Sequence, residues 1–336
     1  MVSGISVVLD NLNLKTAEMN TEQMPASFLK RLLSAGFYAM TSILIIVCNK
    51  SVLTVYNFPS SQVLAVGQMV FSILLLGFLG LIGKIYVPWP SFATFQKIWP
   101  LPLLYCGNLF SGLGGTKELS LPMMTVLRRF SVFMILVAEI WILNASFSNL
   151  VYFSVGVMIV GAIIAAVNDL SFNLAGYCYI LVNNLFTTVN GVVTKQKLDV
   201  KELGKYAIIF YNSLFMIIPA VCLAYSSGEV DKASKFDQWT DVGFLLNFLC
   251  SCGMGFVLMY SIVLCTQYTS ALTVSVIGCT KNVFIAYFGM VFGGDYVFSW
   301  PNFWGLTISV MGSLIYAYAT FKPPSGRSAN SNTSKA

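Results

Sequence analysis

Histidine is absent from the sequence, and charged residues are scarce. Only 10% of the 336 residues are Asp, Glu, Lys or Arg, whereas 57% are hydrophobic and the mean hydropathy is +0.77. Soluble domains carry about 25% charged residues, so a water-soluble globular protein is excluded. Without histidine the chain lacks the commonest general base and the commonest metal ligand, and we expect neither a metal site nor a cofactor.

Cysteine is present, but never in the spacing of a metal or redox motif. The eight cysteines are scattered through apolar runs, and none belongs to a Cys-x-x-Cys motif. The nearest two, Cys250 and Cys252, would diverge on a helix. We predict small buried apolar side chains rather than disulfide partners or metal ligands.

Long apolar runs dominate the chain and predict an all-α polytopic membrane protein. A bilayer core requires about 20 apolar residues per helix. Ten segments meet this length approximately: 33–53, 62–83, 99–117, 122–142, 150–168, 174–195, 205–226, 242–266, 270–293 and 301–321. Segment 99–117 is the weakest because its prolines and glycines would kink a helix. The prediction is therefore ten transmembrane helices.

The distribution of Lys and Arg predicts how these helices are oriented. Placing the polar N-terminal tail, residues 1–31, in the cytosol assigns twelve cations to the cytosolic side: Lys15, Lys30, Arg31, Lys84, Lys97, Lys195, Lys197, Lys201, Lys205, Lys322, Arg327 and Lys335. The opposite side receives three: Lys117, Lys232 and Lys235. This positive-inside bias places both termini in the cytosol, including a disordered tail at 322–336. The net charge of +6 is then an orientation signal, so lipid rather than nucleic acid is the expected surrounding.

Two stretches of sequence indicate an internal repeat. Residues 147–166 and 298–317 share five identities at a constant offset of 151 positions. The match divides the chain into five-helix halves, residues 32–168 and 169–321. An odd number of helices per half makes the two repeats inverted, and inverted repeats are typical of transporters with a binding site near the bilayer midplane. Chance similarity between apolar helices is the alternative.

Polar side chains form stripes on two of the predicted helices. The stripe on segment 174–195 consists of Asn183, Thr187, Asn190 and Thr194, and segment 33–53 has Tyr38, Ser42, Ile45 and Asn49 at the same spacing. In lipid, such stripes must face other helices or water. They favour a shared polar cavity between the two halves, and interhelical hydrogen bonding is the alternative.

The apolar segments contain more cations than anions. Arg128, Arg129, Lys281 and Lys50 lie within or at the edges of segments, whereas Glu139 is the one carboxylate inside any of them. Glu139 follows Arg128 by eleven residues, too far along one helix for direct pairing. This excess of positive charge predicts an anionic solute, and guanidinium groups match phosphate well. Alternatively, the arginines end a helix and reach the headgroups.

Segment 205–226 begins with aromatic and amide side chains together. Tyr211 follows Phe210 and precedes Asn212 and Ser213. Such a group can stack on a nucleobase and hydrogen-bond its edge, although an aromatic pair in a membrane helix is more often packing.

Several motifs together resemble the nucleotide-sugar transporters of the drug/metabolite transporter superfamily, over roughly residues 30–321. The segment FYNS (210–213) is similar to the FYNN-type motif of that family, and GCTKN (278–282) to its GALNK-type motif. Further stretches resemble the animal transporters of UDP-glucuronic acid, UDP-N-acetylgalactosamine and UDP-N-acetylglucosamine, including the fringe-connection type. They are PLPLLYCGN (100–108), LSLPMMTVLRRFS (119–131), TKQKLDVKELGKY (194–206), VLCTQYTSALT (263–273) and VFGGDYVF (291–298).

The resemblance implies an antiporter in the Golgi or endoplasmic reticulum membrane that exchanges cytosolic UDP-sugar for luminal UMP. It implies that Asn212 and Ser213 contact the base, that Arg128 contacts phosphate, and that residues of 278–282 contact ribose, phosphate or sugar. The order Lys281–Asn282 reverses the family motif, which leaves open which side chain faces the phosphates. The complete predicted site is Tyr38, Asn49, Lys50, Arg128, Arg129, Asn183, Asn190, Tyr211, Asn212, Ser213, Gly278, Thr280, Lys281 and Asn282.

Two other functions compete with this interpretation. An exchanger of small phosphate esters, such as a triose-phosphate carrier, would use the same cationic cavity. A polytopic glycosyltransferase would need catalytic carboxylates and a sizeable domain outside the bilayer, and the longest loop, about 227–241, is small. The sequence leaves the preferred sugar and the oligomeric state open, a homodimer included.

Overall fold

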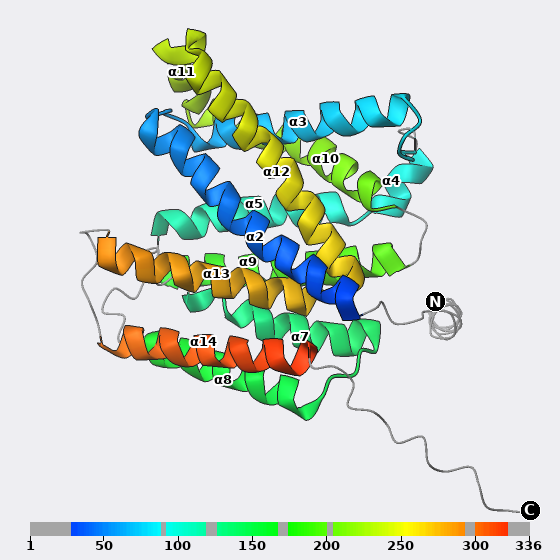
Figure 1. The fold of residues 1–336 in the computed structure, drawn as a ribbon, viewed down its shortest axis with the longest axis vertical. Coiled ribbons are helices and arrows are strands. Elements are labelled where there is room, and N and C mark those ends of the chain that lie inside the picture. The colour runs from blue at the N-terminus through cyan, green and yellow to red at the C-terminus, as the bar shows by residue number, and fades with distance from the viewer. Residues whose placement is uncertain are drawn as a thin grey trace, which may run out of the picture.

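Ten long α-helices make up most of the computed structural model, which describes residues 28–88, 92–118, 126–166, 174–199, 204–292 and 300–321 (Figure 1). They are α2 (Phe28–Lys50), α3 (Ser61–Leu81), α5 (Leu101–Glu118), α7 (Phe130–Leu143), α8 (Asn149–Ala166), α9 (Leu174–Asp199), α10 (Lys205–Ser226), α12 (Val242–Tyr268), α13 (Ala271–Phe292) and α14 (Trp300–Phe321). Each overlaps one of the ten segments predicted from the sequence. Residues 28–31 of the predicted N-terminal tail belong to α2, and residues 1–27 and the predicted C-terminal tail, 322–336, lie outside the described residues.

Shorter elements connect or extend these helices. They are a π-helical turn (Ser51–Val55) that continues α2, α4 (Phe92–Ile98), α11 (Glu229–Ser234) and a 3₁₀ turn (Asp237–Thr240). Polar side chains cap several helix starts: the Ser60 hydroxyl accepts a bond from Val63 N, and the Asp241 carboxylate accepts from Gly243 N and Phe244 N. These bonds satisfy N–H groups that a first helical turn leaves free.

The outer surface of the bundle is apolar. Large hydrophobic side chains such as Trp141, Leu81 and Leu246 are more than half exposed. Within the described residues, five helices are long and apolar enough to cross a bilayer. The chain therefore has the all-helical build of a polytopic membrane protein.

The prediction that all cysteines are buried is wrong for three of them. All eight thiols are free, but Cys178, Cys222 and Cys250 lie on the exposed surface. Because a lipid-facing surface is apolar, a small hydrophobic side chain is tolerated there as well as in the core.

The structure corrects the predicted helix over 122–142. Arg128 and Arg129 lie in a turn, and α7 begins only at Phe130. Around this turn, the N–H groups of Arg129, Ser131 and Val132 bond to carbonyls three residues earlier instead of four. Hydropathy alone could not reveal this tighter turn. The arginine pair consequently lies at an irregularity in the backbone rather than on a regular helical face.

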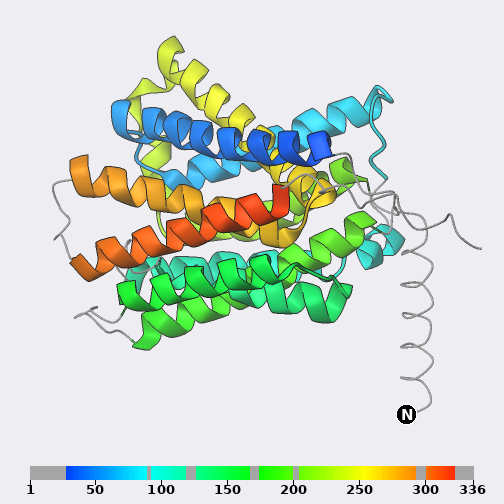
Figure 2. The ribbon, with the colours of Figure 1, turned by 60° about the horizontal axis from the view of Figure 1, so that its bottom comes forward.

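Helices from the two halves of the chain pack against each other throughout the bundle (Figures 1 and 2). The main pairs are α8 with α14, α5 with α9, α2 with α12, α3 with α10, α3 with α12, and α7 with α9. Each joins a helix from residues 28–166 to one from residues 174–321. The core is therefore built mainly from contacts between distant parts of the sequence.

The contact between α8 and α14 is close and reciprocal. A Cβ placed on Gly161 would lie 2.6 Å from Gly305 O, and one placed on Gly312 would lie 2.9 Å from Ser154 O. Gly161 and Gly312 are 151 positions apart, as are Ser154 and Gly305. Exchanging the members of each equivalent pair therefore turns one contact into the other, as in an isologous interface. The two helices run antiparallel.

Candidate ligand-binding cavity

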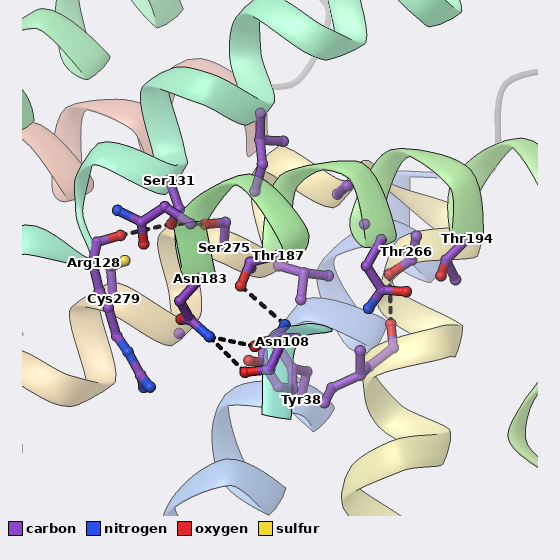
Figure 3. A pocket seen from close by; sticks show the side chains of 18 of the residues that line it. Tyr38, Asn108, Arg128, Ser131, Asn183, Thr187, Thr194, Thr266, Ser275 and Cys279 are labelled. Carbon is purple, nitrogen blue, oxygen red and sulfur yellow. Dashed lines mark hydrogen bonds between the residues drawn. The ribbon is translucent and has the colours of Figure 1, made fainter. Parts of the chain in front are cut away.

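A cavity of about 400 Å³ lies in the centre of the bundle (Figure 3). Residues of α2, α5, α7, α9, α12 and α13 and of the turn before α7 line it. Its volume falls in the range of roughly 300–1,000 Å³ that is typical of small-molecule sites. The lining is polar along α9 and cationic near the turn that contains Arg128.

The polar stripe of α9 faces this cavity. Asn183, Thr187, Asn190 and Thr194 all belong to the lining. Two of them also join α9 to α5: Asn183 Nδ2 donates to Asn108 Oδ1 at 2.6 Å, and Thr187 Oγ1 accepts from Asn108 Nδ2 at 3.1 Å (Figure 3). The stripe thus borders a cavity and bonds to a neighbouring helix at the same time.

The corresponding stripe of α2 is divided between two places. Tyr38 lines the cavity, but Asn49 does not. Asn49 Oδ1 accepts bonds from Ser251 Oγ at 2.6 Å and from Gln68 Nε2 at 3.0 Å. Lys50 is exposed on the surface. Of the predicted α2 residues, only Tyr38 is therefore at the cavity.

Two of the four segment cations line the cavity. They are Arg128 and Lys281, whereas the buried Arg129 is not part of the lining. Among the described residues, neither Arg128 nor Lys281 has an ion-pair or side-chain hydrogen-bond partner, and Arg128 Nε is fully buried. Burying an unpaired charge is costly. This end of the cavity is therefore suited to an anionic ligand.

Glu139 does not neutralise these cations. Its Oε1 accepts bonds from the backbone N–H groups of Ala271 at 2.7 Å and Leu272 at 3.3 Å. These two residues form the N-terminus of α13, where the helix dipole favours a negative charge. The carboxylate thus joins α7 to α13 and leaves the positive charge of the cavity uncompensated.

The predicted nucleobase motif lies outside the cavity in this conformation. Tyr211, Asn212 and Ser213 are buried in α10, and none belongs to the lining. Tyr211 Oη donates to Pro88 O at 2.6 Å. This bond ties α10 to the segment that follows α3, and the aromatic ring packs in the apolar core.

The second predicted motif reaches the cavity at three positions. Gly278, Cys279 and Lys281 are part of the lining, and a Cβ on Gly278 would lie 3.2 Å from Tyr38 Oη. Thr280 Oγ1 instead donates to Val276 O within α13. The side chain of Asn282 lies outside the described residues.

Sequence reasoning missed cavity residues on α5 and α12. Tyr105, Asn108 and Thr266 all line the cavity. Asn108 is a single amide in the segment judged weakest for a membrane helix, and its polarity in that apolar context was the available signal. Tyr105 and Thr266 carry no such signal, because isolated aromatic and hydroxyl side chains are common in membrane helices.

Comparison with known proteins places the chain in a family. Residues 29–317 match the Triose-phosphate Transporter family. The chain belongs to this family. It is therefore a transporter and not an enzyme, which confirms the sequence resemblance and excludes the glycosyltransferase.

Several curated relatives are similar over most of their length. The UDP-sugar transporter UST74c of Drosophila melanogaster is 49% identical over 94% of this chain and 85% of its own length. The human nucleotide sugar transporter SLC35D2 is 50% identical over 86% of both chains. The Caenorhabditis elegans UDP-sugar transporter sqv-7 is 48% identical over 91% of this chain and 93% of its own.

A solved crystal structure shares the fold. It superposes with a TM-score of 0.58 over 84% of this chain and 98% of its own length, at 11% sequence identity. At this identity the likeness concerns the arrangement of helices alone.

Proposed function

We propose that the protein is an antiporter that carries UDP-sugars into the lumen of the Golgi apparatus or endoplasmic reticulum in exchange for UMP. The observation that carries this proposal is a pair of cations, Arg128 and Lys281, that have no partner among the described residues and line a polar cavity within an otherwise apolar bundle. A diphosphate supplies the missing negative charge, and a guanidinium can bind it bidentately. The names of the relatives from Drosophila and Caenorhabditis support UDP-sugars as the substrate class.

The same cations account for obligatory exchange. If the empty cavity closed, Arg128 and Lys281 would be buried together without a counter-charge, and this state is costly. A bound UDP-sugar or UMP removes the cost. The protein therefore changes conformation readily only when a nucleotide is bound, which couples entry of one nucleotide to exit of the other.

The packing of the helices supports two inverted five-helix repeats, residues 32–168 and 169–321. If α2, α3, α5, α7 and α8 are exchanged for α9, α10, α12, α13 and α14, each main helix pair maps onto a pair that is also in contact, although α7–α9 and α3–α12 map onto smaller contacts. The pair α2–α12 becomes α9–α5, while α3–α10 and α8–α14 map onto themselves. Such an arrangement lets the halves rock about a central site.

In this proposal all ten long helices cross the membrane, and both termini are cytosolic. The excess of Lys and Arg on one side supports the orientation. The predicted base contacts, Asn212 and Ser213, then require a movement of α10 toward the cavity, because both are buried outside it here. A homodimer is compatible with the apolar outer surface.

A second candidate function is the exchange of small phosphate esters, which the name of the matched family favours. The cations would bind such esters equally well. The neutral polar part of the cavity along α9 distinguishes the two, because it would have no partner on a small ester.

Transport by the purified full-length chain tests both candidates. Labelled UDP-, GDP- and CMP-sugars are offered to proteoliposomes with and without internal UMP. We expect UDP-sugars alone to accumulate, only in UMP-loaded vesicles, and free UMP to inhibit uptake. Equal uptake into empty vesicles would contradict exchange, and inhibition by triose phosphate but not by UMP would support the second candidate.

A further inference from the structure

The hydrogen bonds between α5 and α9 fix the orientation of the Asn183 amide. Asn183 Nδ2 donates to the backbone carbonyl of Asn108 at 2.8 Å and to the Asn108 side-chain oxygen at 2.6 Å (Figure 3). A backbone carbonyl only accepts hydrogen bonds, so the nitrogen of Asn183 must point toward α5. Its Oδ1 therefore points away from α5, and no described residue donates to it.

The orientation of Asn183 in turn fixes that of Thr187. Because Asn108 Oδ1 accepts from Asn183, Asn108 Nδ2 is the group that faces Thr187 and donates to its hydroxyl at 3.1 Å. The Thr187 hydroxyl thus already accepts a bond, and its own proton has no acceptor among the described residues. Among the described residues, the network thus leaves Asn183 Oδ1 available as an acceptor and the Thr187 hydroxyl available as a donor.

This donor and acceptor lie beside the cationic end of the cavity. A Cβ placed on Gly112 of α5 would lie 3.1 Å from Asn183 Nδ2 and 3.8 Å from Arg128 Nη2. Both side chains therefore pack near Gly112, and both also line the cavity, as Thr187 does. A ligand whose phosphate contacts Arg128 has Asn183 and Thr187 in the same cavity for its neighbouring atoms.

Chemistry identifies which part of a UDP-sugar is adjacent to the phosphate. Carbon 2 of the sugar is bonded directly to the anomeric carbon that carries the diphosphate, whereas the whole ribose separates uracil from it. A 2-acetamido group carries an N–H donor and a C=O acceptor at opposite ends. It can bridge two residues one helical turn apart, whose Cβ atoms are about 5–6 Å from each other.

We propose that Asn183 and Thr187 bind the substituent on carbon 2 of the transported sugar and favour a 2-acetamido group over a hydroxyl group. This inference rests on the proposed function. Asn183 Oδ1 accepts from the amide N–H, and the Thr187 hydroxyl donates to the acetyl C=O. Asn108 is a positioning residue, because its hydrogen bonds hold both groups in these roles.

Competition for UMP exchange tests the proposal on the full-length protein in proteoliposomes. Labelled UMP is exchanged for internal UMP while UDP-N-acetylglucosamine, UDP-glucose or UDP-2-deoxyglucose competes. We expect the wild type to bind these three competitors with decreasing affinity. Thr187→Val should weaken the binding of UDP-N-acetylglucosamine about tenfold, the effect of one lost hydrogen bond. The same variant should change the affinities for UDP-2-deoxyglucose and UMP less than twofold.

Two further variants control for structural effects. Thr187→Ser keeps the hydroxyl and should restore wild-type selectivity. Thr188→Val makes the same change one residue along, at a buried hydroxyl outside the cavity with no described partner, and should leave selectivity unchanged. If Thr187→Val does not fold, equal affinity of the wild type for UDP-N-acetylglucosamine and UDP-2-deoxyglucose would still overturn the proposal.

The possible outcomes also separate this inference from the proposed function. A wild type that exchanges no UMP and responds to no UDP-sugar would contradict the proposed function itself. A wild type that exchanges normally, with Thr187→Val weakening all competitors equally, would contradict only the role of Asn183 and Thr187, because the thermodynamic cycle would show no coupling to carbon 2.

Discussion

The α8–α14 contact and the central cavity are both buried, but the contact is closely packed and the cavity contains cations without a described partner. At the contact, the backbones approach so closely that a Cβ on Gly305 would lie 2.5 Å from Ala165 N. In the cavity, Arg128 Nε is buried without a described partner and Lys281 has no counter-charge among the described residues. The comparison indicates that close packing of backbones holds the two halves together, while the cavity is where cations without a described counter-charge border open space that a ligand can fill.

Removing a cavity cation should have the largest effect on transport and almost none on folding. We expect Lys281→Ala to reduce UMP exchange at least ~100-fold, because an interaction with a charged phosphate in a buried site is worth about 3 kcal/mol or more. The midpoint of thermal unfolding should stay the same or rise, since the lost charge has no partner among the described residues. Exchange in proteoliposomes and unfolding in detergent measure the two effects.

The matched variant Lys281→Arg keeps the charge and should retain measurable exchange. Normal exchange by Lys281→Ala would contradict the electrostatic account. A large loss of thermal stability in the same variant would mean that Lys281 stabilises the packing of the helices instead of binding the ligand.

Adding one methyl group to the α8–α14 contact should have the reverse effect. Gly305→Ala would place its Cβ against Ala165 N and Gly161 O, neither of which can move without shifting a helix. We expect a loss of about 3 kcal/mol in the free energy of unfolding. Gly156→Ala on α8 is the control, because nothing lies within 4 Å of its Cβ. That variant should gain about 0.5–1 kcal/mol from the better helix propensity of alanine, and equal stability of the two variants would contradict the close contact.

Glu139 has an ionisable side chain, as Arg128 and Lys281 in the cavity do, but it stabilises the packing of two helices, as the α8–α14 contact does. It is a buried charge, but its Oε1 caps the N-terminus of α13 through Ala271 N and Leu272 N. Glu139→Leu should lower the free energy of unfolding by about 1–3 kcal/mol, because two backbone N–H groups lose their acceptor. Glu139→Gln keeps a carbonyl oxygen there and should cost less. If Glu139→Leu instead abolished exchange at unchanged stability, Glu139 would be part of the transport mechanism.

The positions of the helices could be predicted from the sequence, because a bilayer dictates their length and hydropathy. The five identities between 147–166 and 298–317 predicted an internal repeat but not the close contact of α8 with α14, in which Gly161 and Gly312 are equivalent. The turn at Arg128 could not be predicted, since hydropathy does not depend on whether an N–H group bonds to the carbonyl three or four residues earlier. It lies next to residues 119–125, which are outside the described part of the chain.

The cavity residues were predictable where several polar side chains repeat at helical spacing. The stripe of α9 shows this clearly, because four polar residues on one face of an apolar helix require a polar neighbour. Helical spacing alone was not sufficient, because the stripe of α2 was predicted in the same way and only its Tyr38 lines the cavity. The single amide of Asn108 on α5 lies at the cavity, whereas Asn49 of the α2 stripe does not. Their difference depends on which helix packs opposite, and a pattern within one segment does not contain that information.

Replacing Asn49 should have the smallest effect on transport, and it tests where the ligand-binding part of the bundle ends. Its Oδ1 accepts bonds from Ser251 and Gln68 in a network separate from the one at Asn108. Asn49→Ala should lower the free energy of unfolding by about 1 kcal/mol, as for one lost side-chain partner. The affinity for UMP should change less than twofold, because Asn49 does not line the cavity. A tenfold loss of UMP affinity at unchanged stability would extend the binding site to this second network and show that a paired amide can also serve the ligand.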